Sequence, residues 1–224
     1  IVLNTDNTKT HLSKSLAKFY VKVNNPSLNV VLGGLVGSNK HMVTNSRVLI
    51  DVELYGPEQI DDTGLIDEIN VETSIVGGLV GENSGTITTS FFRDGSVINN
   101  ANAAKKDGSL LGGFVGQNSG VILQSYAMGC STEREDTLNH VSLAGAVRTI
   151  RNSLGGFVHV NSGTITDCLV NMVIEKAGTK GSAGGFVYRN TSSGKISNCI
   201  ENNNIIITEG VTSSYYAPFV QVNG

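Results

Sequence analysis

The sequence predicts an all-β protein: a parallel β-helix, or β-solenoid, of about six coils with three short strands in each coil. The prediction rests on a repeat in which two glycines precede a large apolar residue and a valine, and an asparagine follows six positions after the first glycine. Self-similarity at a period of roughly 20–50 residues is typical of repeat architectures, in which each unit buries its apolar face only against its neighbours. The six blocks start at Gly33, Gly77, Gly112, Gly155, Gly184 and, in degenerate form, Ala217.

Each block is expected to form the first strand of its coil, with its large apolar residue pointing into the core. Stacked coils lie roughly 4.8 Å apart, so six coils would make a rod of about 25–30 Å. No coil can bury its apolar face alone, and we therefore expect these residues to stack into one inner row. That row comprises Leu35, Leu79, Phe114, Phe157, Phe186 and Phe219.

The asparagine behind each block marks a tight turn. In the second, third and fourth copies it is followed by serine and glycine. Asparagine tolerates left-handed backbone angles and glycine adopts them without steric cost. Stacked coils would place the side chains in a ladder, satisfying amides whose burial would otherwise cost about 1–3 kcal/mol each. The predicted ladder is Asn39, Asn83, Asn118, Asn161, Asn190 and Asn223.

A second strand follows this turn, and a third closes the coil. The second is clear at 86–91 and the third at 169–175, which are β-branched runs with partial alternation. Length differences between copies fall after the second strand, so we expect loop insertions at one corner of a right-handed helix. The insertions span 57–68, 101–109 and 131–139.

The unbroken repeat favours a single domain over residues 1–224, with recognisable copies from about residue 30 and a preceding partial coil or cap at 1–29. The sequence starts within a strand-like segment and stops in mid-repeat. We therefore interpret it as a piece of a longer protein whose targeting signals lie elsewhere. Its 27 glycines, 3 prolines and 16% charged residues suit many tight turns and few helices.

Charge and hydropathy exclude two classes of partner. With 16 basic and 19 acidic residues the formal net charge is -3, which provides no electrostatic footprint for nucleic acid. No apolar run approaches the roughly 20 residues that a membrane-spanning helix needs. We expect no nucleic-acid partner and no membrane insertion by this segment.

Neither the glycines nor the histidines predict a cofactor or metal site. The blocks lack the Gly-Lys-Ser/Thr ending and the strand–loop–helix context of phosphate-binding loops. We therefore interpret their glycines as places where the coil bends or packs closely. The four histidines occur in no metal-binding pattern. His159 replaces Gly116 in register and is expected to point outward or into a turn.

The three cysteines are an odd number, which argues against a closed disulfide framework. Cys168 and Cys199 take the position that serine occupies in the earlier copies. We expect them to be small inward residues of the core. A disulfide between the two stacked positions is compatible with their separation but would need specific dihedral geometry. Cys130 is out of register and is interpreted as a loop thiol.

Charged residues gather in the insertions, where they are candidates for partner binding. The carboxylates among them could instead bind calcium or act as acid and base, as in pectate-lyase-like β-helices. General acid–base work needs paired carboxylates at a defined separation, which a sequence does not show. The candidate partner-binding residues are Asp61, Asp62, Glu68, Lys105, Lys106, Glu133, Arg134 and Glu135.

Two aromatic pairs leave two interpretations open. Phe91 with Phe92, and Tyr215 with Tyr216, could face solvent and stack on sugars. Alternatively, one member of each pair points inward and the other is a surface neighbour. Residues 190–192 match a glycosylation acceptor, which we interpret as a turn.

Two segments of the repeat closely resemble the GLUG motif: 77–87, which reads GGLVGENSGTI, and 112–129. The family pattern is a glycine-rich Leu-Val-Gly block, then Asn-x-Gly-x-Ile, then Ser-Tyr-Ala-x-Gly. Copies occur in large bacterial surface and secreted proteins, among them haemagglutinin-like adhesins and the IgA-cleaving metalloproteases of Gram-positive cocci. The resemblance covers residues 30–224 and implies a secreted or wall-attached bacterial protein with a β-solenoid stalk or display region. It carries over no catalytic residue, because the zinc motif of those proteases is absent from this sequence.

The leading functional hypothesis is a non-catalytic extracellular module of an adhesin-like protein, with no cofactor and no bound metal. It would act as a rigid stalk or as a binding surface for a host or cell-surface protein or a glycan, attached to the rest of its parent chain. One alternative is a carbohydrate-active β-helix resembling polysaccharide lyases or hydrolases. Another is an accessory domain of a larger secreted protease or toxin.

Overall fold

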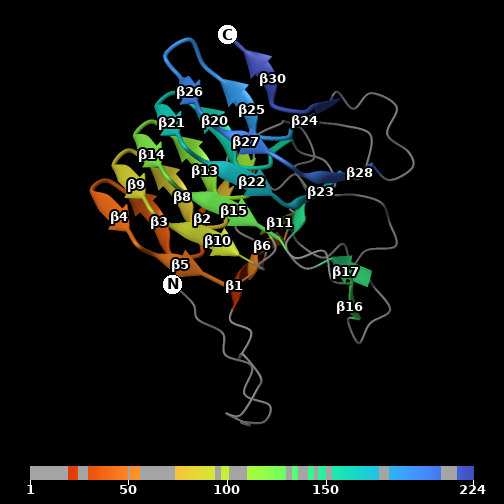
Figure 1. The fold of residues 1–224 in the computed structure, drawn as a ribbon. Coiled ribbons are helices and arrows are strands. Elements are labelled where there is room, and N and C mark those ends of the chain that lie inside the picture. The colour runs from red at the N-terminus through yellow and green to blue at the C-terminus, as the bar shows by residue number, and fades with distance from the viewer. Residues whose placement is uncertain are drawn as a thin grey trace, which may run out of the picture.

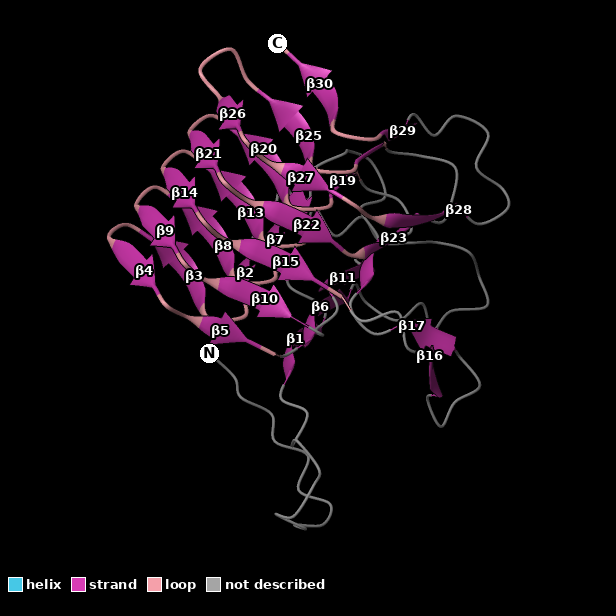
Figure 2. Ribbon diagram, in the orientation of Figure 1, coloured by secondary structure: helices cyan, strands magenta, loops and turns pink. Residues whose placement is uncertain are grey.

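The computed structural model is an all-β stack of parallel strands, which confirms the predicted fold class (Figure 1). Five sheets of five or six parallel strands run along the stack, and one further pair of strands is antiparallel. Figure 2 shows strands joined by turns, with no helix in the described part of the chain. The described residues are 20–24, 30–49, 51–55, 74–93, 97–100, 110–129, 133–135, 141–143, 146–149, 153–176, 182–207 and 216–224.

Each complete coil contributes one strand to every sheet, always in the same order. We number the five sheets in that order, and the coils one to six along the chain. The sixth coil contributes strands only to the first and second sheets within the described residues. In the second coil the order is β7 (Ile75–Gly77), β8 (Val80–Asn83), β9 (Thr86–Thr88), β10 (Phe91–Arg93) and β11 (Val97–Asn100).

The other strands occupy equivalent positions in the five sheets. The first sheet adds β2 (Val31–Gly33), β12 (Leu110–Gly112), β19 (Leu154–Gly155), β24 (Ala183–Gly184) and β29 (Tyr216–Ala217). The second adds β3 (Val36–Asn39), β13 (Val115–Asn118), β20 (Val158–Asn161), β25 (Val187–Asn190) and β30 (Val220–Asn223). The third adds β4 (Met42–Thr44), β14 (Val121–Leu123), β21 (Thr164–Thr166) and β26 (Lys195–Ser197). The fourth adds β5 (Arg47–Val48), β15 (Tyr126–Met128), β22 (Leu169–Asn171) and β27 (Ile200–Glu201). The fifth adds β1 (Tyr20–Asn24), β6 (Asp51–Tyr55), β18 (Ala146–Thr149), β23 (Val173–Lys176) and β28 (Asn204–Ile207).

A bend divides each of the first two strands expected per coil, so that a coil has five short strands. The first bend lies at the glycine block, where the backbone folds closely on itself. A Cβ atom at Gly77 would lie 2.0 Å from the carbonyl oxygen of Val80, which explains why only glycine fits there. The second bend lies between the third and fourth sheets, where one residue per coil has a positive φ of 48–55°. These residues are Asn45, Thr89, Gln124, Asp167 and Asn198.

The insertions all adjoin the fifth sheet, but they enter at the two corners that flank it and not at the single corner that the sequence predicts. The connections 56–74 and 101–109 follow its strands β6 and β11. The connection 129–145 instead precedes β18 and contains the antiparallel pair β16 (Glu133–Glu135) and β17 (Val141–Leu143). Coil four makes the same crossing, from β22 to β23, with one residue, Met172.

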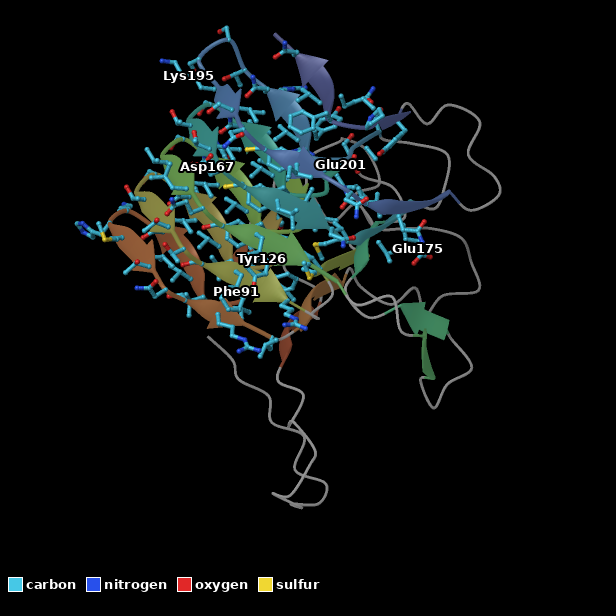
Figure 3. The ribbon with its side chains drawn as sticks, viewed as in Figure 1. Phe91, Tyr126, Asp167, Glu175, Lys195 and Glu201 are labelled. Carbon is cyan, nitrogen blue, oxygen red and sulfur yellow. The ribbon has the colours of Figure 1, made fainter. Side chains whose placement is uncertain are left out.

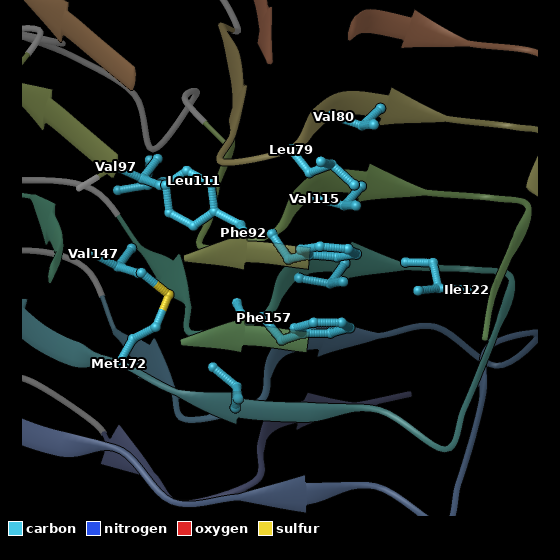
Figure 4. Close-up of a cluster of buried hydrophobic side chains, with 14 of the residues drawn as sticks. Leu79, Val80, Phe92, Val97, Leu111, Val115, Ile122, Val147, Phe157 and Met172 are labelled. Atoms are coloured by element: carbon cyan, nitrogen blue, oxygen red, sulfur yellow. The ribbon is translucent and has the colours of Figure 1, made fainter. Parts of the chain in front are cut away.

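Inner rows of apolar side chains fill the centre of the stack (Figure 4). The row of the glycine blocks is the most regular: Leu79, Phe114, Phe157 and Phe186 have no exposed surface. From Phe114 to Phe219, successive ring centroids lie 4.7, 4.9 and 4.8 Å apart. These ring contacts join the row from coil three to coil six.

The two ends of the stack are less well covered. Leu35 in coil one is 43% exposed, and Phe219 in coil six is half-buried. Strand β1 pairs in parallel with β6, from Tyr20 opposite Asp51 to Asn24 opposite Tyr55, so residues 20–24 extend the fifth sheet beyond coil one. Within the described ranges there is no helix with the length and apolar character needed to cross a membrane.

Candidate functional site

The asparagines of the repeat end the strands of the second sheet and form a continuous amide ladder. Each Nδ2 atom donates to the Oδ1 atom of the next asparagine, at 2.7 Å from Asn39, 2.8 Å from Asn83, Asn118 and Asn161, and 3.2 Å from Asn190. In coils two to four the same nitrogen also donates to the carbonyl two residues later, at 3.3 Å. The hydrogen bonds of these amides lie within the stack, so their role is structural.

The ladder includes the residue that matches a glycosylation acceptor. Asn190 is 9% exposed, and its Nδ2 atom donates to the Gly194 carbonyl at 3.1 Å as well as to Asn223. Attachment of a glycan would require this side chain to leave the ladder. The structural role therefore explains the asparagine at this position.

A second polar row lines the inner side of the bend between the third and fourth sheets. Ser90 Oγ donates to the carbonyl two residues earlier at 2.9 Å and accepts the backbone N–H of Ser46 at 3.1 Å. Ser125 repeats both bonds at 2.7 and 3.2 Å. Cys168 and Cys199 follow in the same row, and each Sγ contacts the carbonyl two residues earlier at 3.1 Å. Cys168 is 2% exposed and Cys199 is half-buried; both are free thiols.

His159 is buried, and the expectation that it points outward or into a turn is wrong. It is 4% exposed, and its ring lies against Tyr188 at a centroid distance of 4.6 Å. A Cβ atom at the equivalent Gly116 would lie 2.5 Å from Ile75 Cγ2, so side chains at this position turn into the angle between the first and second sheets. Burial, followed by the positive charge of Arg189, lowers the pKa of His159 to about 3. Neither ring nitrogen has a hydrogen-bond partner among the described residues.

The Phe91–Phe92 pair divides between the core and the surface. Phe92 has no exposed surface, whereas Phe91 lies on the outer face of the fourth sheet (Figure 3). The Phe91 ring stacks on Tyr126 with a centroid distance of 4.7 Å and an interplanar angle of 3°. The guanidinium carbon of Arg47 lies 5.4 Å from the Phe91 centroid and covers its other face. Since both ring faces are occupied, Phe91 presents its edge to solvent, which does not suit stacking on a sugar.

The outer faces of the third and fourth sheets carry linear rows of side chains. On the third sheet the outward positions are rich in hydroxyl groups, and Thr166 and Ser197 hydrogen-bond at 3.0 Å. At the adjoining bend, Asn198 donates to Asp167. The row on the fourth sheet has a sequence signal, because its residues directly follow the inner serine or cysteine of each coil. The row on the fourth sheet is Arg47, Phe91, Tyr126, Leu169 and Ile200.

The core becomes polar at its C-terminal end. Glu201 takes the position of the buried Val170 in the inner row of the fourth sheet, and its Oε1 accepts the backbone N–H of Asn203 at 3.0 Å. Asn203 in turn donates to the Gly185 carbonyl at 2.6 Å. Tyr216 ends the inner row of the first sheet, and its buried hydroxyl has no hydrogen-bond partner among the described residues. Burial, and then the charge of Glu201, raise the Tyr216 pKa to about 12.

Most of the predicted partner-binding residues lie outside the described residues. Those are Asp61, Asp62, Glu68, Lys105 and Lys106. Glu133, Arg134 and Glu135 form β16, which pairs with β17 within the connection before β18. Cys130 and Tyr215 are also outside the described part. The structure therefore brings the insertions to the same sheet without placing their side chains.

The described residues contain no group of three or more His, Cys, Asp or Glu side chains that could hold a metal ion. No family model matches the chain, and no curated protein or solved structure is significantly similar to it. The resemblance to the GLUG motif accordingly remains a sequence-based prediction.

Proposed function

We propose that this chain is a non-catalytic extracellular β-solenoid module of a bacterial surface or secreted adhesin-like protein, where it acts as a rigid stalk or presents a binding surface. The observation that carries the proposal is the in-register stacking of all five sheets. Backbone hydrogen bonds tie each coil to the next, and the amide ladder fixes the register. Outward side chains consequently stand in rows at the coil spacing, an arrangement that suits an extended recognition surface.

The side of the fifth sheet is the preferred position for a partner. Its flanking connections differ in length from coil to coil, from one residue in coil four to the 129–145 segment in coil three. Connections on a rigid scaffold tolerate such variation and often carry binding residues. We propose that a host or cell-surface protein, or a glycan, is bound there. The GLUG-like repeat supports the secreted or cell-surface location.

The binding proposal is tested with a connection exchange that the chain itself suggests. Residues 129–145 are replaced by one methionine, because Met172 makes the same crossing in coil four. The full chain and this variant are compared for binding to host cells and to immobilised glycans. Retained circular dichroism and thermal unfolding show that the stack survives the exchange. The proposal expects weaker binding by the variant; unchanged binding by this variant and by one shortened at 101–109 would overturn it.

The non-catalytic part of the proposal is tested separately. The full chain is incubated with anionic polysaccharides, with and without calcium, and the products are analysed by size and by unsaturated ends. The proposal expects no cleavage products. Release of oligosaccharides that disappears on substitution of an insertion carboxylate, such as Asp62→Asn, would overturn it in favour of a carbohydrate-active β-helix.

A further inference from the structure

Cys168 and Cys199 occupy the same position in successive coils. The residues that follow them, Leu169 and Ile200, pair directly, and the backbone N–H of Ile200 donates to the Cys168 carbonyl at 2.9 Å. Neighbouring parallel strands lie about 4.7–4.9 Å apart. This spacing falls within the range of about 4.4–6.8 Å that separates the Cα atoms of disulfide-bonded residues. The backbone therefore already holds the two cysteines at a separation that a disulfide spans.

The two thiols also have matching surroundings. Each Sγ lies 3.1 Å from the carbonyl oxygen two residues earlier and 3.8 Å from a carbonyl oxygen of the preceding coil. A thiol is a weak donor, so these contacts resist rotation of the side chain only weakly. Turning one Sγ toward the other about χ1 breaks no strong hydrogen bond.

The two thiols differ in solvent exposure and in pKa, and this difference sets the order in which they react. Cys199 is half-buried, and the hydrogen bond from the Cys168 thiol lowers the Cys199 pKa. That bond, together with burial, raises the pKa of Cys168, which is 2% exposed. Because the thiolate is the reactive form, Cys199 is the thiol that reacts first with an external reagent.

We propose that Cys168 and Cys199 are a disulfide-forming pair that joins coil four to coil five when a low-molecular-weight disulfide such as oxidised glutathione is the oxidant. The Cys199 thiolate attacks one sulfur of the oxidant, forms a mixed disulfide and releases one glutathione thiolate, which is protonated. Cys168 then loses its proton to solvent and attacks Cys199 Sγ, releasing the second glutathione. Two protein thiols are oxidised and one disulfide is reduced.

The bond would strengthen the less apolar end of the stack. It would close a loop that contains the five strands β22 to β26, and thus hold coil five against coil four. Cross-linking a folded chain restricts its unfolded state, and we expect the melting temperature to rise by roughly 5–10 °C. This modification is independent of what the module binds.

Intact-mass spectrometry and peptide mapping of the full chain test the pair. The reduced, folded protein is incubated with oxidised glutathione, and the expected result is a loss of about 2 Da and a peptide that links Cys168 to Cys199, with the higher melting temperature. Cys168→Ser and Cys199→Ser should each abolish the link. Both variants should fold, because serine occupies this row in coils one to three. Each should instead accumulate the glutathione adduct at the remaining thiol, faster for Cys168→Ser.

A third variant separates the pair from the remaining cysteine. Cys130→Ser should form the same disulfide at the same rate as the unmodified chain. The proposal is overturned if the folded protein keeps its reduced mass, if Cys130 supplies one end of the link, or if the link forms only after denaturant is added.

Discussion

The middle coils and the C-terminal coils share a repeat but differ in what fills the interior. In coils two to four most inner rows are apolar; the ladder amides among them bond to neighbours on both sides, as Asn118 does between Asn83 and Asn161, and the other buried polar side chains are the inner serines and His159. In coils five and six the corresponding rows contain Glu201, Asn203 and Tyr216, and the tyrosine hydroxyl is unpaired within the described residues.

This difference affects the stability of the C-terminal coils. A sheet edge with unpaired backbone groups invites association, and an inward-facing charge is one of the features that oppose it. Glu201 supplies such a charge in coil five. Exposed apolar residues occur in coil one (Val31, Leu35 and Met42) and also in the C-terminal coils (Ile200 and Val222). We therefore expect stability to reside in the middle coils and the C-terminal end to open first.

Exchanging apolar and charged residues within the inner row of the fourth sheet should give the largest change in the free energy of unfolding. Val170→Glu places a carboxylate in the middle of the apolar fourth-sheet row and should cost about 5 kcal/mol or more at pH 7, since that position has no exposed surface. The reciprocal Glu201→Val should change the free energy of unfolding by about 1 kcal/mol at most, because position 201 is half-buried. Urea unfolding measures both. Similar costs at the two positions would remove the distinction between middle and end.

Acid should destabilise the stack through His159. Its pKa is about 3 when folded, against an ordinary value of 6.5, so between these values the unfolded chain binds the additional proton. Stability from this residue is present above pH 6.5 and falls as the pH drops toward 3, by up to about 4–5 kcal/mol.

A variant isolates this contribution to the pH dependence. His159→Phe removes the titrating ring but keeps an aromatic side chain against Tyr188. The free energy of unfolding, measured by urea titration at pH 7, 5.5 and 4, should fall less steeply for the variant than for the unmodified chain. Parallel curves would show that His159 remains accessible to protons in the folded state.

Truncation within the aromatic row should depend on position. Phe157→Ala removes a fully buried ring that stacks at 4.7 Å on Phe114 and at 4.9 Å on Phe186, and should cost about 3–5 kcal/mol. Phe219→Ala removes a half-buried ring with one stacked neighbour and should cost about half as much. Chemical denaturation compares them, and an equal loss at both positions would contradict the account.

Substitutions in the amide ladder should also cost more stability in the middle coils than at the C-terminal end, although each cost is smaller than in the aromatic row. Asn118→Ala leaves the Asn83 donor and the Asn161 acceptor without their partner, and should cost about 2–4 kcal/mol. Asn223→Ala at the exposed end removes one 3.2 Å acceptor and should cost less than about 1 kcal/mol. Thermal unfolding is sufficient to compare the two. A neutral Asn118→Ala would mean that water replaces the buried amide.

Much of the architecture was predictable because strict repetition aligns residues before any contact is known. The spacing of the glycine blocks predicts which residues stack, and the position of Cys168 after three serines, Ser46, Ser90 and Ser125, predicts that it faces inward. Repetition does not reveal bends within a strand. The positive-φ position holds Asn, Thr, Gln, Asp and Asn in successive coils, so residue type gives no signal there.

The direction of single side chains was harder to predict. The residue before His159 in its row is Gly116, and glycine has no side chain from which a direction could be inferred. The sequence allows Phe91 to face outward, but it does not show that Arg47 and Tyr126 occupy the two faces of the ring. The charged candidate residues lie in long connections between strands, and the repeat does not predict how those connections fold.

Native-state hydrogen exchange, resolved by coil, tests most directly the claim that stability is concentrated in the middle of the stack. We expect strand amides of β13 and β20 to exchange most slowly, close to the rate set by global unfolding, and those of β26, β27 and β30 to exchange through a lower-energy opening. Oxidation of the Cys168–Cys199 pair should slow the second group selectively. Equal protection in the middle and C-terminal coils of the reduced protein would contradict the account.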